Sequence, residues 1–197
     1  MRRALHYAGA IIAGALSGLG SALWGAGLWP ASSNMAFGNV DAGGWRSDFA
    51  VGSEAADPYT RLRVARHGLL ALAKSEAVYF TRTTDDAGAP LREACTYRLS
   101  GGAMPAQWWS VTLYDARSML PANTDNALSV NAQSFGEGAW SAVIGPRRPA
   151  DGAAWISTRG AGDFDLTLRL YVPEAALLRD PDKVLAPPRI ERLACGA

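Results

Sequence analysis

The sequence is poor in the residues that most often bind metals or carry redox chemistry. Its 197 residues include two histidines and two cysteines. Cys95 and Cys195 lie too far apart for a CxxC redox or zinc motif, and a structural zinc site would need all four residues to converge. His6 precedes a long uncharged segment, whereas His67 follows it, so the two histidines are not expected to meet. We therefore predict neither a metal site nor a bound cofactor.

An excess of charge of either sign is also missing. Lysine and arginine total 19, aspartate and glutamate total 18, and the formal net charge is +1. A nucleic-acid-binding protein needs a clustered basic face. In the middle of the chain, basic residues outnumber acidic ones around Arg61, Arg63 and Arg66, where they fit the solvated face of a predicted helix. Nucleic acid is therefore not an expected partner.

The motifs of several enzyme classes are absent as well. There is no GxGxxG after a predicted strand, no Walker loop and no GxSxG. No spacing of Ser, His and Asp indicates a triad, and His67 is the one histidine beyond the uncharged segment. A carboxylate pair for glycoside hydrolysis would have to come from Asp85, Asp86, Asp115 and Asp125, most of which lie in predicted turns. These absences favour a protein without catalytic activity and leave an enzyme as the alternative.

What the sequence does contain begins with an uncharged segment at residues 8–28. Its length is close to the ~20 residues that a helix needs to cross a hydrocarbon core. Arg2 and Arg3 precede it, and no lysine or arginine follows until Arg46. This bias predicts a cytoplasmic N-terminus and a domain on the periplasmic side of a bacterial inner membrane.

The same segment is either a retained membrane anchor or a signal peptide that is cleaved. Trp24 and Trp29 are typical of an interfacial belt and Pro30 would end the helix, which favours a retained anchor over residues 1–30. A cleaved signal peptide is the alternative, with weak cleavage candidates at residues 25–27 and 31–33. Both interpretations deliver the rest of the chain to the same side.

Small residues recur at every fourth position of this segment. They are Ala10, Gly14, Gly18, Ala22 and Ala26. Such a stripe lets two helices approach closely in lipid. It predicts either a homodimer or docking on another membrane protein, and a segment that is simply rich in Gly and Ala explains it equally well.

Beyond the segment, the chain divides into three parts. Residues 31–56 are irregular and predict a linker, with Trp45 and Phe49 as contacts to a core. Asp57 and Pro58 begin an amphipathic helix predicted over residues 57–75. Residues 76–197 contain short β-type runs separated by Gly and Pro turns, at 78–83, 91–99, 107–114, 127–133, 139–144, 153–158, 164–172 and 190–193. The pattern predicts a mainly β fold, an antiparallel jelly-roll-like β-sandwich.

The two cysteines both fall in this exported part. Cys95 lies in a predicted strand and Cys195 directly after the last one. Because oxidation is expected outside the cytoplasm, the simplest state is a disulfide between them. A buried free thiol at Cys95 and an intermolecular bond through Cys195 are the alternatives.

Several stretches of the β part occur together in one protein family. They are residues 86–91 (Asp-Ala-Gly-Ala-Pro-Leu), 97–99 (Tyr-Arg-Leu), 109–115 (Trp-Ser-Val-Thr-Leu-Tyr-Asp) and 164–173 (ending Leu-Arg-Leu-Tyr-Val-Pro), followed by Pro187, Pro188 and Ile190. In this order they resemble the family catalogued as domain of unknown function 1214, over roughly residues 76–195. The family often has Asn-Trp-Leu-Pro before the alternating strand, whereas this chain has Ala-Trp-Ile-Ser at 154–157. The resemblance implies a jelly-roll-like β domain and supplies no reaction.

Two sets of residues are candidates for ligand binding. Trp109 alternates in phase with the apolar residues of its strand, so we expect Trp108 to share the opposite face with Ser110, Thr112 and Tyr114. A core role for both tryptophans is nevertheless the favoured interpretation, and a binding face that contains Trp108 is the alternative. The second set consists of three arginines in predicted strands, Arg82, Arg98 and Arg169. We expect them either to be solvated or to converge on an anionic ligand or on an acidic side chain. The candidate acids are Asp115, Asp163 and Asp165.

The leading hypothesis is therefore a membrane-anchored, non-catalytic envelope domain that binds a partner protein, a glycan or a lipid-like ligand. An envelope enzyme acting on a carbohydrate or small molecule is the first alternative, and an accessory subunit of a membrane complex is the second. A pocket with convergent carboxyl groups of raised pKa would favour the enzyme.

Overall fold

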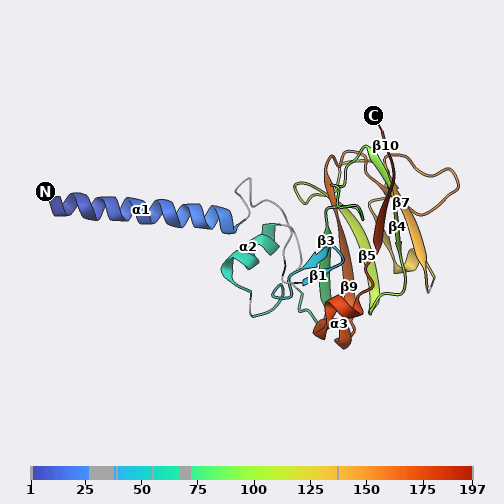
Figure 1. Ribbon diagram of the computed structural model, residues 1–197, viewed down its shortest axis with the longest axis horizontal. Helices are drawn as coiled ribbons and strands as arrows, with labels where there is room; N and C mark the ends of the chain where they lie inside the picture. Colours follow the sequence, from blue (N-terminus) through green and yellow to red (C-terminus); the bar gives the residue numbers. More distant parts are fainter. Residues whose placement is uncertain are drawn as a thin grey trace.

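A long N-terminal helix precedes a β domain in the computed structural model, which describes residues 2–26, 38, 40–54, 56–66, 72–136 and 138–196. Helix α1 (Arg2–Gly25) extends away from the rest of the chain (Figure 1). Its stretch His6–Gly25 is long and apolar enough to cross a membrane and is almost wholly exposed. A signal sequence would have the same length and composition. Trp29 and Pro30 lie outside the described residues.

The larger sheet of the β domain has six strands in the order β1-β2-β3-β9-β5-β6. Each of these pairs is antiparallel. The alternation of apolar and polar residues in β9 separates Leu166, Leu168 and Leu170 on one face from Asp165, Thr167 and Arg169 on the other. The bounds are Val40–Ala42 (β1), Trp45–Ser47 (β2), Ala77–Arg82 (β3), Phe164–Pro173 (β9), Ala106–Asp115 (β5) and Ser129–Asn131 (β6).

The smaller sheet has four strands in the order β10-β4-β7-β8. Strands β10 (Arg189–Cys195), β4 (Cys95–Gly101) and β7 (Trp140–Gly145) pair antiparallel, whereas β8 (Trp155–Ser157) runs parallel to β7. The prediction of a purely antiparallel fold is therefore wrong for this pair. The loop 146–154 lets the chain cross over and return in the same direction, which a short strand pattern does not reveal.

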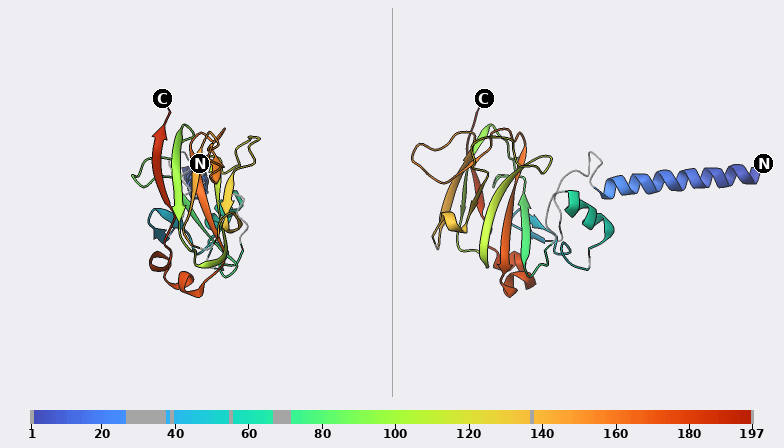
Figure 2. Two further views of the ribbon diagram at one scale, coloured as in Figure 1. Left: turned by 90° about the vertical axis from the view of Figure 1, so that its right-hand side faces the viewer. Right: turned by 180° about the vertical axis from the view of Figure 1, so that it is seen from behind.

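The two sheets pack face to face around one core, as the views in Figure 2 show. Leu166, Leu168 and Leu170 of β9 are fully buried on the inner face, and burying each such side chain contributes roughly 1.5–3 kcal/mol. Between the sheets, the ring centroids of Trp109 and Trp140 lie 4.4 Å apart. The fold is mainly β, built from two packed sheets.

The hairpin of β1 and β2 lies within the stretch predicted to be a linker. Its turn holds Gly43 and Gly44 at φ 60° and 87°, a conformation that favours glycine, and the Gly44 N–H donates to Asp41 Oδ1 at 2.8 Å. Trp45 is fully buried, and its indole N–H donates to the Pro188 carbonyl at 2.7 Å. The expected core contact of Trp45 is confirmed.

Three short helices complete the described chain, together with a 3₁₀ turn at Ala132–Ser134. They are α2 (Pro58–Arg66), α3 (Ala175–Arg179) and α4 (Pro181–Val184). The predicted start of α2 is confirmed, because Asp57 Oδ1 accepts from the backbone N–H groups of Tyr59 and Thr60. Residues 67–71, with His67, lie outside the described residues. The prediction that this helix extends to residue 75 is wrong, because residues 74–76 form a turn directly before β3.

Candidate functional site

The six-stranded sheet has one face against the core and a second face turned away from it. Because successive side chains of a strand point to opposite sides, the residues of β3, β9 and β5 alternate between these two faces. We call the second one the outer face. It comprises Tyr79 and Thr81 from β3, Asp165, Thr167, Arg169 and Tyr171 from β9, and Trp108, Ser110, Thr112 and Tyr114 from β5.

Four aromatic rings stand on the outer face. Trp108 and Tyr171 are cross-strand partners whose ring centroids lie 5.3 Å apart at 63°. Tyr79 and Tyr114 stand on the two strands that flank β9. All four side chains are half-buried, and aromatic rings that keep some exposed surface, such as those of Trp108 and Tyr171, can pack against another molecule.

Arg169 lies between two of these rings. Its guanidinium carbon is 6.0 Å from the ring centroid of Tyr79 and 5.3 Å from that of Tyr114. Its Nη2 also donates a hydrogen bond to the Tyr114 hydroxyl. Cation–π contacts on two sides orient the guanidinium on the sheet surface.

Asp165 supplies a buried carboxyl group at one end of the outer face, opposite Tyr114. Burial raises its pKa to about 7. A hydrogen bond from the Thr167 hydroxyl and the charge of Arg169 act in the opposite direction, and the nearby Asp115 adds to the rise. The outer face therefore holds an acid that exchanges its proton near neutral pH.

A cleft opens along the β3 side of the outer face. Tyr79 and Thr81 form part of its wall, and Arg46, Asp48 and Lys74 also line it. Arg46 forms an ion pair with Asp41 at 3.4 Å, whereas Lys74 has no ion pair among the described residues. The cleft thus adds a basic side chain beside the aromatic rings.

Of the six residues predicted to bind a ligand, Trp108, Tyr114 and Arg169 share the outer face. Trp109 is buried in the core, whereas Trp108 is half-buried and lies outside it. The predicted division of this strand into two faces matches the structure, and the favoured core role is correct for Trp109 and wrong for Trp108. Their role in binding stays a prediction.

Arg82, another predicted candidate, lies on the inner side of β3. It is 7% exposed, its Nη2 donates to the Asp85 carbonyl at 2.9 Å, and the same nitrogen pairs with Asp86 at 3.0 Å. Its Nε has no hydrogen-bond partner in the described part of the chain. Arg82 therefore fixes the loop after β3 and does not reach the outer face.

Arg98 and Asp115 also lie elsewhere. Arg98 belongs to the smaller sheet and pairs with Glu191 at 3.0 Å in a half-exposed position. Asp115 ends β5 on the inner side and pairs with Arg117 at 2.9 Å. Although burial acts to raise it, hydrogen bonds from Met119 N and from Arg117 hold the pKa of Asp115 below its ordinary value. Arg82, Arg98 and Arg169 therefore do not converge.

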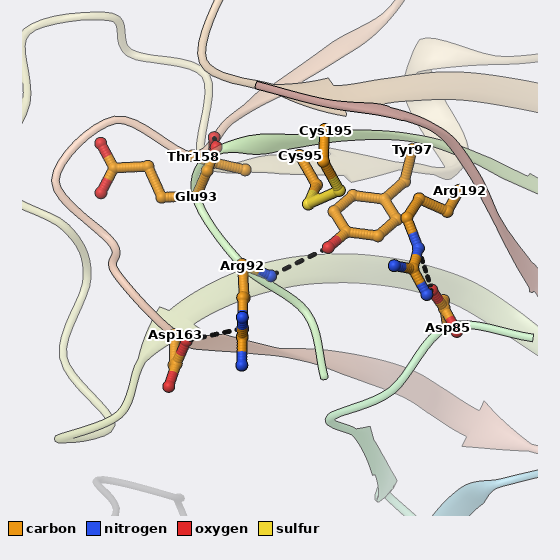
Figure 3. The surroundings of a disulfide bond; sticks show 9 residues. All are labelled: Asp85, Arg92, Glu93, Cys95, Tyr97, Thr158, Asp163, Arg192 and Cys195. Atoms are coloured by element: carbon orange, nitrogen blue, oxygen red, sulfur yellow. Dashed lines mark hydrogen bonds and ion pairs between the residues drawn. A yellow bond between two sulfur atoms is a disulfide. The ribbon is translucent and has the colours of Figure 1, made fainter. Parts of the chain in front are cut away.

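Cys95 and Cys195 are joined by a disulfide that connects β4 to the end of β10. Figure 3 shows the Tyr97 ring beside it, with the Tyr97 hydroxyl accepting from the Arg92 N–H at 2.9 Å. Nearby, Arg192 Nε donates to the buried Asp85 carboxylate at 2.7 Å. The bridge and this ion pair hold the last strand in place.

Sequence reasoning missed the parts of the outer face that come from neighbouring strands. Tyr79 carried no signal of its own, because its place beside Arg169 depends on the register of β3 against β9. Tyr171 could have been found, since it alternates in phase with Arg169. Asp165 was considered as a partner of an arginine but not as a buried acid.

Two solved structures are similar to the chain, and the first of them shares its fold. The VPA0106 protein from Vibrio parahaemolyticus is 18% identical with a TM-score of 0.54, over 71% of this chain and 36% of that one. A putative uncharacterized protein from Burkholderia cenocepacia is 15% identical with a TM-score of 0.42, over 59% and 29% of the two chains. The chain thus spans about a third of the length of these proteins. None of the curated proteins compared with it matches.

A family model covers the strands that build the outer face. The model is described as "Protein of unknown function (DUF1214)" and matches residues 76–175. This range includes all of β3, β5 and β9, and it agrees with the resemblance seen in the sequence. The chain belongs to the DUF1214 family.

Proposed function

We propose that the outer face binds a carbohydrate and that the domain does so outside the cytoplasm. The observation that supports this is the combination of half-buried rings and polar side chains on one sheet face. A sugar ring has apolar C–H patches that pack on aromatic rings, and its hydroxyl groups need hydrogen-bond partners. Trp108 and Tyr171 offer the rings, while Thr112 and Arg169, which are half-buried, offer the polar groups.

The exposure of these rings favours a binding surface over a structural one. The inner face of the same strands already supplies the core between the sheets. On the other face, Trp108 and Tyr171 pack on each other across strands, and part of their surface stays exposed. Exposed apolar patches with polar surroundings are typical of interaction sites.

The proposed location follows from two features. Helix α1 is apolar enough to be a membrane span or a signal sequence, and the disulfide is typical of an oxidising compartment. We place the domain in the periplasm, held at the inner membrane by α1, with release after cleavage as the alternative. We also propose that the two packed sheets form a jelly roll.

A binding measurement with matched tryptophan variants tests the function. Titration of the full chain in detergent with oligosaccharides, followed by calorimetry, should give saturable heat for at least one of them. Trp108→Ala should weaken this binding roughly tenfold, since losing one ring contact costs about 1–2 kcal/mol.

The control is Trp155→Ala, because Trp155 is also partly buried but lies in the smaller sheet, where its indole N–H donates to the Gly145 carbonyl. The Trp155→Ala variant should bind the oligosaccharide as tightly as the unaltered protein does. Equal affinities of the Trp108 variant and the unaltered protein, or no binding of any saccharide, would contradict the proposal.

An enzyme acting on the same class of molecule is the second candidate, because Asp165 has a pKa of about 7 and such acids are common at active sites. A glycosidase normally uses two carboxyl groups at one site. The other acid near Asp165 is Asp115, which points to the inner side and pairs with Arg117. New reducing ends after incubation with a bound oligosaccharide would favour the enzyme.

A further inference from the structure

We propose that the carbohydrate is acidic and that Arg169 binds one of its carboxylate groups through the planar guanidinium. The inference depends on the proposed function, because it names the ligand class of the same face. The following contacts support it.

Arg169 differs from the other arginines that lie within described strands. Arg46, Arg82, Arg98, Arg189 and Arg192 each form an ion pair with Asp or Glu. Arg169 forms none with a described residue, although it is half-buried. A partly desolvated charge without a counter-ion is costly unless a partner arrives. The ligand is the natural source of that partner.

The nearby acid does not take this place. Asp165 is on the same strand and the same face, but it forms no ion pair with Arg169. Its hydrogen bond comes from Thr167. The charge of Arg169 acts on Asp165 from a distance, but no ion pair or hydrogen bond joins the two groups in the described part of the chain.

The orientation of Arg169 suits a carboxylate. Tyr79 and Tyr114 flank the guanidinium on the neighbouring strands, and one N–H is used by the Tyr114 hydroxyl. The other guanidinium N–H groups have no acceptor among the described residues. A planar group with free, adjacent donors binds a carboxylate through two parallel hydrogen bonds. The ring of the same sugar would then meet Trp108 or Tyr171.

A second basic side chain lies along the same edge. Lys74 lines the cleft beside Tyr79. Asp48 and Arg46 line the cleft as well, so the cleft holds two basic side chains and one acidic one. A chain of uronic acid units bound at Arg169 and extending along this edge would meet Lys74, which favours an oligomer over a single sugar.

Tetragalacturonate and its fully methyl-esterified form provide matched probes, since esterification removes the charge and keeps the rings. In titrations of the full chain at low salt, the acid should bind at least tenfold more tightly than the ester. This preference should shrink as salt is added. Arg169→Gln should remove most of the preference and leave only the share that Lys74 contributes. Arg169→Lys should restore part of the loss, because lysine keeps the charge without the planar donors.

Arg98→Gln is the control, because Arg98 is a half-exposed strand arginine on the smaller sheet, and it should leave the preference unchanged. Equal binding of both probes by the unaltered chain would overturn the acidic ligand and leave the carbohydrate proposal standing. If neither probe and no other saccharide binds, both the acidic ligand and the carbohydrate proposal are overturned. Inorganic phosphate binding as tightly as the uronate would also overturn the inference, since the rings would then contribute nothing. The titrations with the two probes and with phosphate use the unaltered chain, so they test the inference even if a variant fails to fold.

Discussion

Asp165 is a carboxyl group whose burial makes the stability of the protein depend on pH near neutrality. Its pKa is about 7 in the folded chain, against 3.8 for an ordinary aspartate. Between these values the folded protein keeps a proton that the unfolded chain has lost. The free energy of unfolding should therefore fall as the pH rises from about 4 to about 7, by at most about 4 kcal/mol. Asp165→Asn should flatten this dependence and raise the melting temperature at pH 8.

Thermal unfolding followed by circular dichroism at pH 5, 6, 7 and 8 would measure the effect. The matched control is Asp163→Asn, because Asp163 is two residues away, exposed, and paired loosely with Arg92 at 3.8 Å. That variant should follow the curve of the unaltered protein. Parallel curves for Asp165→Asn and the unaltered chain would show that Asp165 is ionised throughout this range.

At the level of single residues, alternation along a strand was enough to separate Trp108 from Trp109. It was not enough to show which side chains meet across strands. Tyr79 and Arg169 are far apart in sequence and meet only through the pairing of β3 with β9. The burial of Asp165 has the same origin, since its neighbours include Tyr114 of β5. A sequence pattern therefore predicts the face of a residue better than its surroundings.

Strand β10 is an element held by two independent attachments. It is an edge strand of the smaller sheet, and the disulfide closes a loop with a sequence separation of 100 residues. Replacing Cys95 and Cys195 together by Ser should lower the free energy of unfolding by about 2–4 kcal/mol. The protein should still fold, because Arg192 keeps its ion pair with the buried Asp85. Urea unfolding would measure the loss.

Intact mass with and without reductant separates the three possible states of the cysteines. A gain of about 2 daltons on reduction would indicate the intramolecular bond, and reductant should not alter the double Ser variant. An unchanged mass with two thiols that react with an alkylating agent would contradict the bond. A dimer mass that halves on reduction would indicate an intermolecular one.

At the level of elements, long strands were easier to predict than short ones. The runs at 107–114 and 164–172 lie within β5 and β9, because a strand of this length shows a clear period. Strands β1 and β2 have three residues each, too few for a period, and their hairpin depends on Trp45 reaching Pro188. The parallel pairing of β8 with β7 likewise depends on non-local contacts, so the direction of β8 could not be predicted from the sequence pattern.

At the level of the whole molecule, α1 meets the rest of the described chain at its last turn. A Cβ atom at Gly25 would lie 2.6 Å from the Tyr59 ring, so the end of α1 lies against α2. Figure 2 shows the rest of the helix extending away from both sheets. A Cβ atom at Gly14 or Gly18 would meet nothing within 4 Å. Dimerisation or docking through Ala10, Gly14, Gly18 and Ala22 therefore stays a prediction about another chain.

An apolar helix with almost no contact to its own domain is unstable in water and needs another environment. In a lipid bilayer its exposed leucine and isoleucine side chains are solvated by acyl chains, whereas a signal sequence would be removed after export. We expect the retained anchor, so mass analysis of the N-terminus in fractionated native cells should find a start near Met1 in the membrane fraction. Carbonate washing at high pH should not release the protein. A soluble protein that starts after residue 26 would contradict the anchor, and the carbohydrate would then be bound by a freely diffusing domain.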